Sequence, residues 1–153
     1  MVATYMVNNH AKKEAQRTEK ESIKAFVQAI QNEIGTLWEL YKRGAGDFLE
    51  KTNNGYPFLY KYIVKQDYFI IYNKNSHFLG KINDALLREQ IIITYTKSKA
   101  IVDSYILNNS ILEKYENMIL LFQQTQNIQF KNNADEYLNS LKDYCDKLTQ
   151  IAS

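Results

Sequence analysis

The chain has 153 residues, of which 45% are hydrophobic and 24% are charged, and its net charge is +2. These fractions are typical of a globular protein with an apolar core and argue against intrinsic disorder. Because the 19 basic and 17 acidic residues are interspersed, we expect no clustered basic surface and no nucleic-acid partner.

Glycine and proline are confined to the middle of the chain. All five glycines and the only proline lie between residues 35 and 80. Since these are the strongest helix breakers, their placement predicts two helical arms around an irregular segment. We therefore expect a mainly α fold of long antiparallel helices in a small bundle, with a short irregular or β-containing insertion near residues 53–66. Residues 1–153 are expected to form a single helical domain.

The first ten residues have a pattern of their own. An apolar patch from Val2 to Val7 is followed, after residues 8–11, by lysines and an arginine that are mixed with glutamates. An apolar patch followed by basic residues is typical of the cytoplasmic end of a membrane helix. No run approaches the ~20 apolar residues of a membrane span. Residues 1–10 are interpreted either as the remnant of a membrane anchor or as a disordered first turn. The first interpretation places the protein at the inner face of the cell membrane, and the second places it in the cytoplasm.

The first predicted helix runs from Ala11 to about Thr52, where apolar residues recur at spacings of three and four. Gly44 and Gly46 interrupt this pattern. They are expected either to bend or end the helix near Arg43, or to allow close contact with a crossing helix.

The middle segment allows two interpretations. Residues 58–64 alternate with a period of two in types that favour strands, and residues 68–72 would supply a partner strand. The competing interpretation makes residues 68–79 a helix, with Asp67 as its N-cap and Gly80 just past its end. Local signals leave both open.

The second helical arm begins with a cap at residues 83–84 and has no obvious stop before Gln126. Such a helix would be roughly 60 Å long. Residues 108–110 could form a break, but the apolar stripe keeps its phase across them, which favours one long helix or two nearly collinear ones. A polar link at residues 127–133 then precedes a final helix from Ala134.

Chemistry-bearing residues are sparse. The chain has two histidines and one cysteine, too few and too far apart for a zinc site, and no glycine-rich phosphate loop. Cys145 lies on the apolar stripe of the final helix, where we expect a buried side chain. We predict no enzyme activity, no catalytic residue, no metal and no cofactor.

The tyrosines are the most unusual feature of the composition, since there are 12 of them. Tyrosine combines a large contact area with a hydrogen-bonding tip and is enriched where proteins bind partners. The alternative is that the rings cover a modest core while their hydroxyls reach water. The candidate ligand or partner surface consists of Tyr56, Tyr60, Tyr62, Tyr68 and Tyr72.

Asn108 is the second candidate site. An amide on an otherwise apolar helical stripe is costly unless it is paired, and in helical assemblies one such residue can fix register and oligomeric state. The alternatives are a helix break at this position or a helix face that is turned to solvent.

Several segments resemble a group of bacterial proteins with no assigned activity. The residues that carry the resemblance are Asp67–Phe69 with Tyr72, then Leu79–Ile82, then Ile91–Ile92 and Asp103–Tyr105. In those proteins a membrane helix near the N-terminus precedes a helical cytoplasmic domain. The resemblance covers about residues 20–110, implies a helix over 68–79 and a missing anchor, and implies no activity or catalytic residue.

These observations favour a non-enzymatic helical interaction module. The long central helix exceeds the width of a compact chain of this size, so part of it must project, bend or pack against another copy. We therefore expect a homo-oligomer, with the membrane surface as a further partner. The alternative function is a small-ligand binding or sensor domain that uses residues 56–72.

Overall fold

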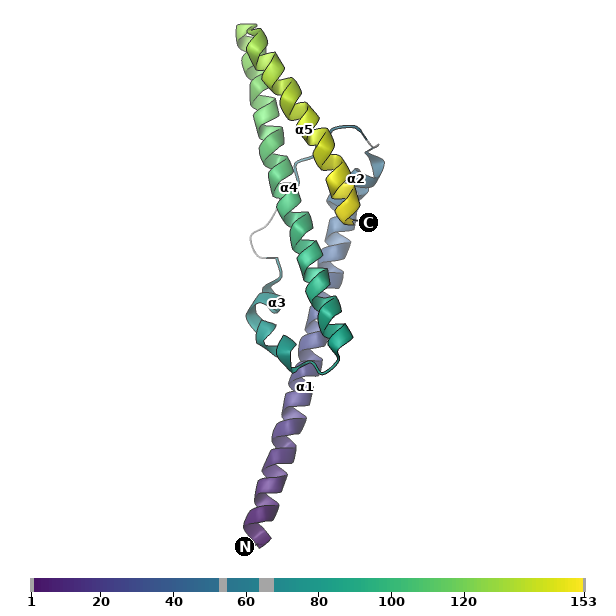
Figure 1. The fold of residues 1–153 in the computed structure, drawn as a ribbon, viewed down its shortest axis with the longest axis vertical. Helices are drawn as coiled ribbons and strands as arrows, with labels where there is room; N and C mark the ends of the chain where they lie inside the picture. Colours follow the sequence, from purple (N-terminus) through teal and green to yellow (C-terminus); the bar gives the residue numbers. More distant parts are fainter. Residues whose placement is uncertain (1, 53–54, 64–67, 153) are drawn as a thin grey trace. The chain divides into compact units, whose positions relative to one another are not determined.

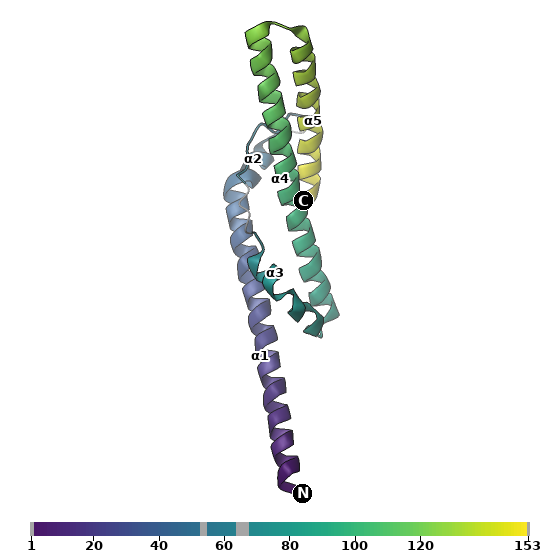
Figure 2. The same ribbon diagram turned by 90° about the vertical axis from the view of Figure 1, so that its left-hand side faces the viewer.

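The computed structural model describes residues 2–52, 55–63 and 68–152 (Figures 1 and 2). Most of these residues are helical, and within these ranges there is no strand. The prediction of a mainly α fold is confirmed. The described part of the insertion, residues 55–63, contains neither helix nor strand.

The chain divides into two compact units. The first comprises Met1–Leu37 and Asp67–Ile91, and the second comprises Trp38–Gln66 and Ile92–Ser153. Helices α1 (Val2–Tyr41) and α4 (Ala85–Thr125) contribute to both. The expectation of a single domain over residues 1–153 stays a prediction.

In the first unit, residues 70–81 are helical. Helix α3 (Ile70–Asn75) is followed by a 3-10 helix, η2 (Ser76–Lys81). The interpretation of residues 68–79 as helical is therefore correct in the type of structure, although the helix begins at Ile70. The alternative, in which residues 68–72 form a strand, is wrong. Gly80 lies within η2 instead of following a helix end, and the proposed cap at Asp67 falls outside the described residues.

The start of α3 is stabilised from a distant part of the chain. Glu33 of α1 accepts hydrogen bonds from the backbone N–H groups of Ile71 at 2.7 Å and Tyr72 at 3.2 Å. These are N–H groups that the first turn of a helix cannot pair internally. Phe69, just before the helix, has a left-handed φ of 66°. Among the residues of this unit whose side chains the structure describes, the buried ones are Phe26, Ile30, Ile82 and Ile91.

The second unit begins with a kink. After Tyr41 the chain forms a π-helical turn, η1 (Lys42–Gly46), and then the short helix α2 (Asp47–Lys51). Gly44 has non-helical angles, φ −120° and ψ −105°, so the predicted bend near Arg43 is confirmed. A Cβ on Gly46 would lie 3.0 Å from Cε1 of Tyr41, so its close contact is with that ring.

The long second arm is one uninterrupted helix. Asp84 caps it, because its Oδ1 accepts the N–H of Leu87 at 3.0 Å, and α4 then continues for 41 residues to Thr125. Helix α5 (Ile128–Ala152) turns back and packs antiparallel along α4 (Figures 1 and 2).

The start of α5 corrects the prediction for this region. The helix begins at Ile128, six residues before the expected Ala134. Asn127 is its N-cap, since its Oδ1 accepts the N–H of Gln129 at 2.9 Å. The polar side chains of residues 127–133 indicate a link in the sequence, but a capped first turn on the solvent side of a helix also tolerates polar side chains.

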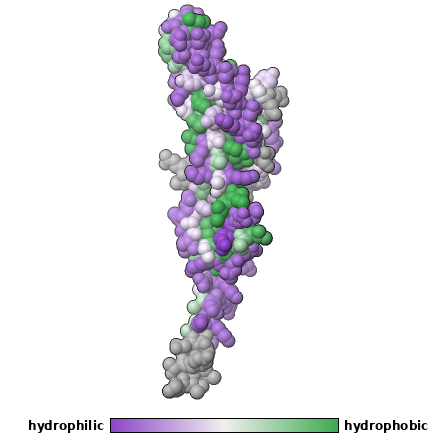
Figure 3. All heavy atoms as spheres, viewed as in Figure 1, coloured by the Kyte–Doolittle hydropathy of each residue, from purple (hydrophilic) through white to green (hydrophobic). Residues whose placement is uncertain are grey.

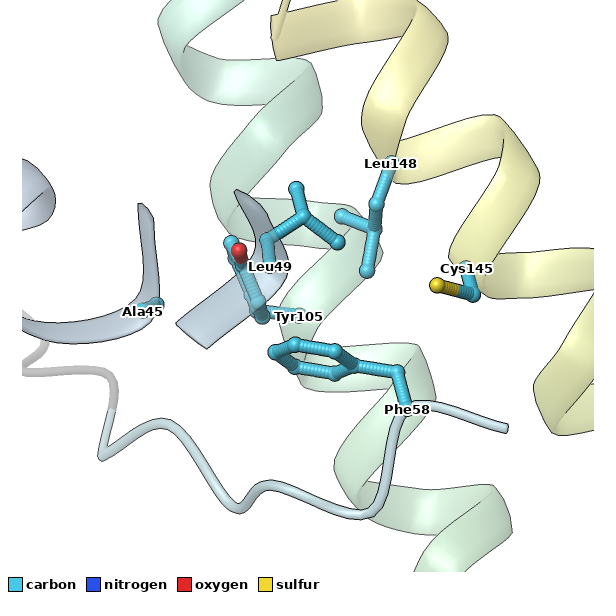
Figure 4. Packing of buried hydrophobic residues seen from close by; sticks show 6 residues of the cluster. All are labelled: Ala45, Leu49, Phe58, Tyr105, Cys145 and Leu148. Carbon is cyan, nitrogen blue, oxygen red and sulfur yellow. The ribbon is translucent and has the colours of Figure 1, made fainter. Parts of the chain in front are cut away.

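The core of the second unit combines side chains from three helices, the π-helical turn and the irregular segment. Figure 4 shows Tyr105 of α4 and Phe58 of the irregular segment next to side chains of α2 and α5. The expected burial of Cys145 is confirmed. The cluster consists of Ala45, Leu49, Phe58, Tyr105, Cys145 and Leu148.

Candidate functional site

Two adjacent asparagines of α4 hold the irregular segment through its main chain. Oδ1 of Asn109 accepts the backbone N–H of Tyr62 at 3.1 Å, and its Nδ2 donates to the carbonyl of the same residue at 2.7 Å. Nδ2 of Asn108 donates to the carbonyls of Phe58 at 3.3 Å and Tyr60 at 3.4 Å. We call Asn108 and Asn109 the asparagine clamp.

The clamp holds the main chain of this segment against α4, and the side chains of the segment are alternately buried and exposed. Phe58 is fully buried and Tyr60 and Tyr62 are half-buried, whereas Leu59 is 50% exposed and Ile63 is 82% exposed. This is the alternation that a strand on a core would show. The side-chain amides of a helix occupy the place that a neighbouring strand would take in a sheet.

Asn108 is buried and only partly satisfied. The side chain has no exposed surface, and its Oδ1 has no hydrogen-bond partner among the described residues. A helix break and a solvent-facing position are therefore both wrong for this residue, since α4 continues through it. Its donor bonds lie within its own chain, and a role in the register of an assembly stays a prediction.

The five candidate tyrosines fall into different environments. Tyr56 is 63% exposed. Tyr60 stacks on Phe48 with ring centroids 4.8 Å apart, and Tyr62 lies 5.1 Å from the ring of Tyr105. These three belong to the second unit, whereas the half-buried Tyr68 and Tyr72 belong to the first. Two of the five thus cover the core of the second unit.

A surface hollow lies beside the kink of the second unit, and sequence reasoning missed it. Its volume is about 230 Å³. The rings of Trp38 and Tyr41 stack with centroids 5.5 Å apart, and Nζ of Lys42 lies 5.7 Å from the Trp38 ring centre. Tyr41 and Lys42 follow Trp38 by three and four positions, and this spacing, which places them on one helix face, is the sign of the hollow within the sequence of that helix. The hollow is lined by Trp38, Tyr41, Lys42, Gly46, Leu49, Glu50 and Thr149.

The titratable groups of the core favour their neutral forms. The hydroxyl of Tyr105 donates to that of Tyr41 at 3.5 Å, and burial raises the pKa of both phenols. Burial also raises the pKa of the Cys145 thiol. A thiol that stays protonated and enclosed is a poor nucleophile. Among the described residues, no three His, Cys, Asp or Glu side chains lie close enough together to hold a metal ion.

In the part of the chain that the structure describes, the fold and these sites define an all-α protein with a main-chain clamp and a small surface hollow. Comparison with protein-family models, curated proteins and solved structures gave no match. None of the helices, over the residues that the structure describes, has a stretch long and apolar enough to cross a membrane.

Proposed function

We propose that this protein is a helical interaction module that self-associates and has no enzymatic activity. The observation that carries the proposal is a second apolar stripe on the second-unit part of α4. This stripe is distinct from the buried residues Tyr95, Tyr105 and Leu112. Its members, which are 40–51% exposed, are Ile92, Ile93, Ile106, Leu107 and Leu120.

Single exposed apolar residues are normal on a protein surface, but these recur regularly. Ile92, Ile106 and Leu120 are 14 residues apart, and Ile93 and Leu107 share that interval. Residues at such multiples of seven lie along one side of a helix. Figure 3 shows hydrophobic residues gathered in patches between broad hydrophilic areas. Apolar patches that recur along one side of a helix are a feature that association would cover.

Sedimentation equilibrium over a wide concentration range tests this proposal. We expect a species heavier than the 18.0 kDa chain, and we expect the variant Ile106→Gln with Leu107→Gln to shift the equilibrium to monomer. Ile128→Gln is the matched control, because this residue is also an exposed helical isoleucine but lies on α5. A wild-type protein that remains monomeric at the highest concentrations would contradict the proposal.

We also propose tethering at the inner face of the membrane. Its support is the apolar patch at residues 2–7 with the basic residues that follow. Fractionation of the native gene product, with an alkaline wash and intact-mass analysis, tests it. A wash-resistant pellet and a mass above 18.0 kDa are expected, whereas a soluble product of 18.0 kDa would contradict tethering.

Binding of a small ligand is a second candidate function, and the hollow is the observation that favours it. Its aromatic wall is formed by Trp38 and Tyr41, and Lys42 and Glu50 place opposite charges in its lining. An aromatic zwitterion would match both features, through ring stacking and two ionic contacts. The site thus differs from the five tyrosines expected from the sequence.

Trp38 is the only tryptophan, so its fluorescence reports directly on this hollow. Titration with phenylalanine, phenethylamine and 3-phenylpropionate should change the emission most with phenylalanine, which carries both charges. Glu50→Gln should remove the advantage of the amine-bearing compounds. Glu39→Gln is the control, since this exposed residue pairs with Arg43 and does not line the hollow. Unchanged emission with all three compounds would contradict binding of an aromatic zwitterion in this hollow.

A further inference from the structure

The exposed side of α4 carries a repeating pattern of charge as well as of apolar residues. At steps of seven residues the chain has Ile92, Lys99, Ile106, Glu113 and Leu120. The order is apolar, basic, apolar, acidic, apolar. All five residues are exposed and belong to the second unit.

This pattern is self-complementary about its centre. We propose that two copies of the chain pair antiparallel through this row of five residues at seven-residue steps, with Ile106 on the two-fold axis. The proposal rests on the self-association proposed above and specifies its geometry. Lys99 then faces the partner's Glu113, and Ile92 faces the partner's Leu120. A two-fold interface requires that the same patch match itself in this way.

A parallel arrangement of the same stripe would not have this match. In register, it would place each Lys99 opposite the partner's Lys99, and each Glu113 opposite the partner's Glu113. Like charges at facing positions disfavour a pairing. The positions of the two charges therefore select the antiparallel orientation, while the three apolar positions supply the burial in either orientation.

The local environment leaves both charges available to a second copy. Nζ of Lys99 lies 3.5 Å from Oδ2 of Asp103 within the same helix, and both side chains are exposed. Exposed pairs of this kind contribute little to stability, so Lys99 can turn toward a second carboxylate at little cost. Glu113 is also exposed, and Ile93 and Leu107 widen the apolar stripe on one side.

The spacing also defines the packing angle. Seven residues are slightly less than two turns of an α-helix, so the stripe drifts by about 20° for each seven-residue step. Two helices that follow such a stripe cross at a small angle, about 20°, in a left-handed sense. From Ile92 to Leu120 the contact would extend over roughly 42 Å at 1.5 Å per residue.

Charge reversal tests the orientation. Lys99→Glu makes both facing pairs repulsive in the antiparallel dimer, and Glu113→Lys does the same. We expect each single variant to weaken the dimer about tenfold. The double variant with both changes restores opposite charges at both positions, so it should return to the wild-type dissociation constant. The measurement is sedimentation equilibrium at low salt, with circular dichroism to show that each variant is folded.

Lys97→Glu is the matched control, because Lys97 is an exposed lysine of α4 that lies off the stripe. It changes the net charge as Lys99→Glu does and should leave the dimer unchanged. High salt should reduce the difference between the single variants and wild type, because exposed charges are screened.

The outcomes separate the two proposals. If wild type is monomeric throughout, self-association itself is wrong. If wild type associates and the charge reversals have no effect, the protein self-associates but the antiparallel pairing about Ile106 is overturned. Two weakened single variants that the double variant does not rescue would also overturn it.

Discussion

Asn109 and Tyr62, 47 residues apart in the chain, exchange two hydrogen bonds: the amide of the asparagine pairs with both the N–H and the carbonyl of the tyrosine. A residue in a sheet pairs with a neighbouring strand in the same way. Here the partner is a helix side chain. The contact holds the irregular segment against α4 without depending on the tyrosine side chain.

Removing this amide should destabilise the second unit. Asn109→Ala leaves the N–H and carbonyl of Tyr62 without their partner, so we expect a loss of about 1–3 kcal/mol in the free energy of unfolding. Urea unfolding followed by circular dichroism measures it. Asn132→Ala is the matched control, since Asn132 is an exposed asparagine within α5. Equal changes in the two variants would show that the clamp contributes nothing.

Asn108 should tolerate loss of its polar group better than gain of a charge. Asn108→Asp replaces the Nδ2 donor by an oxygen that faces the carbonyls of Phe58 and Tyr60. An unpaired buried charge of this kind costs about 3–5 kcal/mol. Asn108→Leu loses the same bonds but also removes the unpartnered Oδ1, so its cost should be smaller. Unfolding in urea at neutral pH gives both values, and the reverse order would contradict this account.

The same substitution should have opposite effects at two glycines. A Cβ on Gly35, inside α1, would meet no heavy atom within 4 Å beyond its chain neighbours and the adjacent backbone of its own helix. Gly35→Ala should therefore stabilise the protein by up to about 1 kcal/mol. At Gly46 the added Cβ would lie 3.0 Å from Cε1 of Tyr41 and 3.2 Å from its carbonyl oxygen. Gly46→Ala should therefore destabilise the protein. Thermal melting of both variants tests the pair, and a shared sign would refute the explanation.

Stability should fall at alkaline pH, in part through Tyr105. Burial raises the pKa of this phenol far above the 10.0 of an unfolded chain. Above pH 10 the unfolded state therefore releases a proton that the folded state keeps, so the stabilisation present below pH 10 is lost as pH rises. Tyr105→Phe should reduce the slope of unfolding free energy against pH by about 1.4 kcal/mol per pH unit.

The internal control for this prediction is the same variant at neutral pH. The Tyr105 hydroxyl donates only a long 3.5 Å bond to Tyr41, so its loss should cost less than about 1 kcal/mol there. Urea unfolding at neutral and alkaline pH gives both quantities. Parallel curves for wild type and variant would contradict the assignment.

Much of the helical architecture could be predicted because its signals are local. Three predicted features each depend on residues within a few positions of one another. They are the cap at Asp84, the regular apolar spacing along α4 and the glycine kink near Arg43. The start of α5 depends on a single N-cap, Asn127. Because the residues around this cap are polar, the sequence resembles a loop there. Local pattern alone does not distinguish an exposed helical turn from a loop.

The irregular segment shows what a local pattern leaves out. The alternation of residues 58–64 favours a strand, and the described residues of this segment form none. In the structure the same alternation separates the buried or half-buried Phe58, Tyr60 and Tyr62 from the exposed Leu59 and Ile63. The hydrogen-bond partners are amides of α4 that lie 47–50 residues away. The hollow beside Trp38 likewise needs Thr149 from α5, and no spacing within one helix indicates that contact.

Cys145 makes α5 accessible to a kinetic measurement. As the only cysteine, and one that is enclosed by the second-unit core, it can react with a thiol reagent only when the packing between α5 and that core opens, through movement of α5 or of the segments that cover it. Its labelling rate, relative to that of the unfolded chain, gives the free energy of this opening. If labelling is faster than global unfolding allows, the packing around Cys145 opens locally while the rest of the protein stays folded.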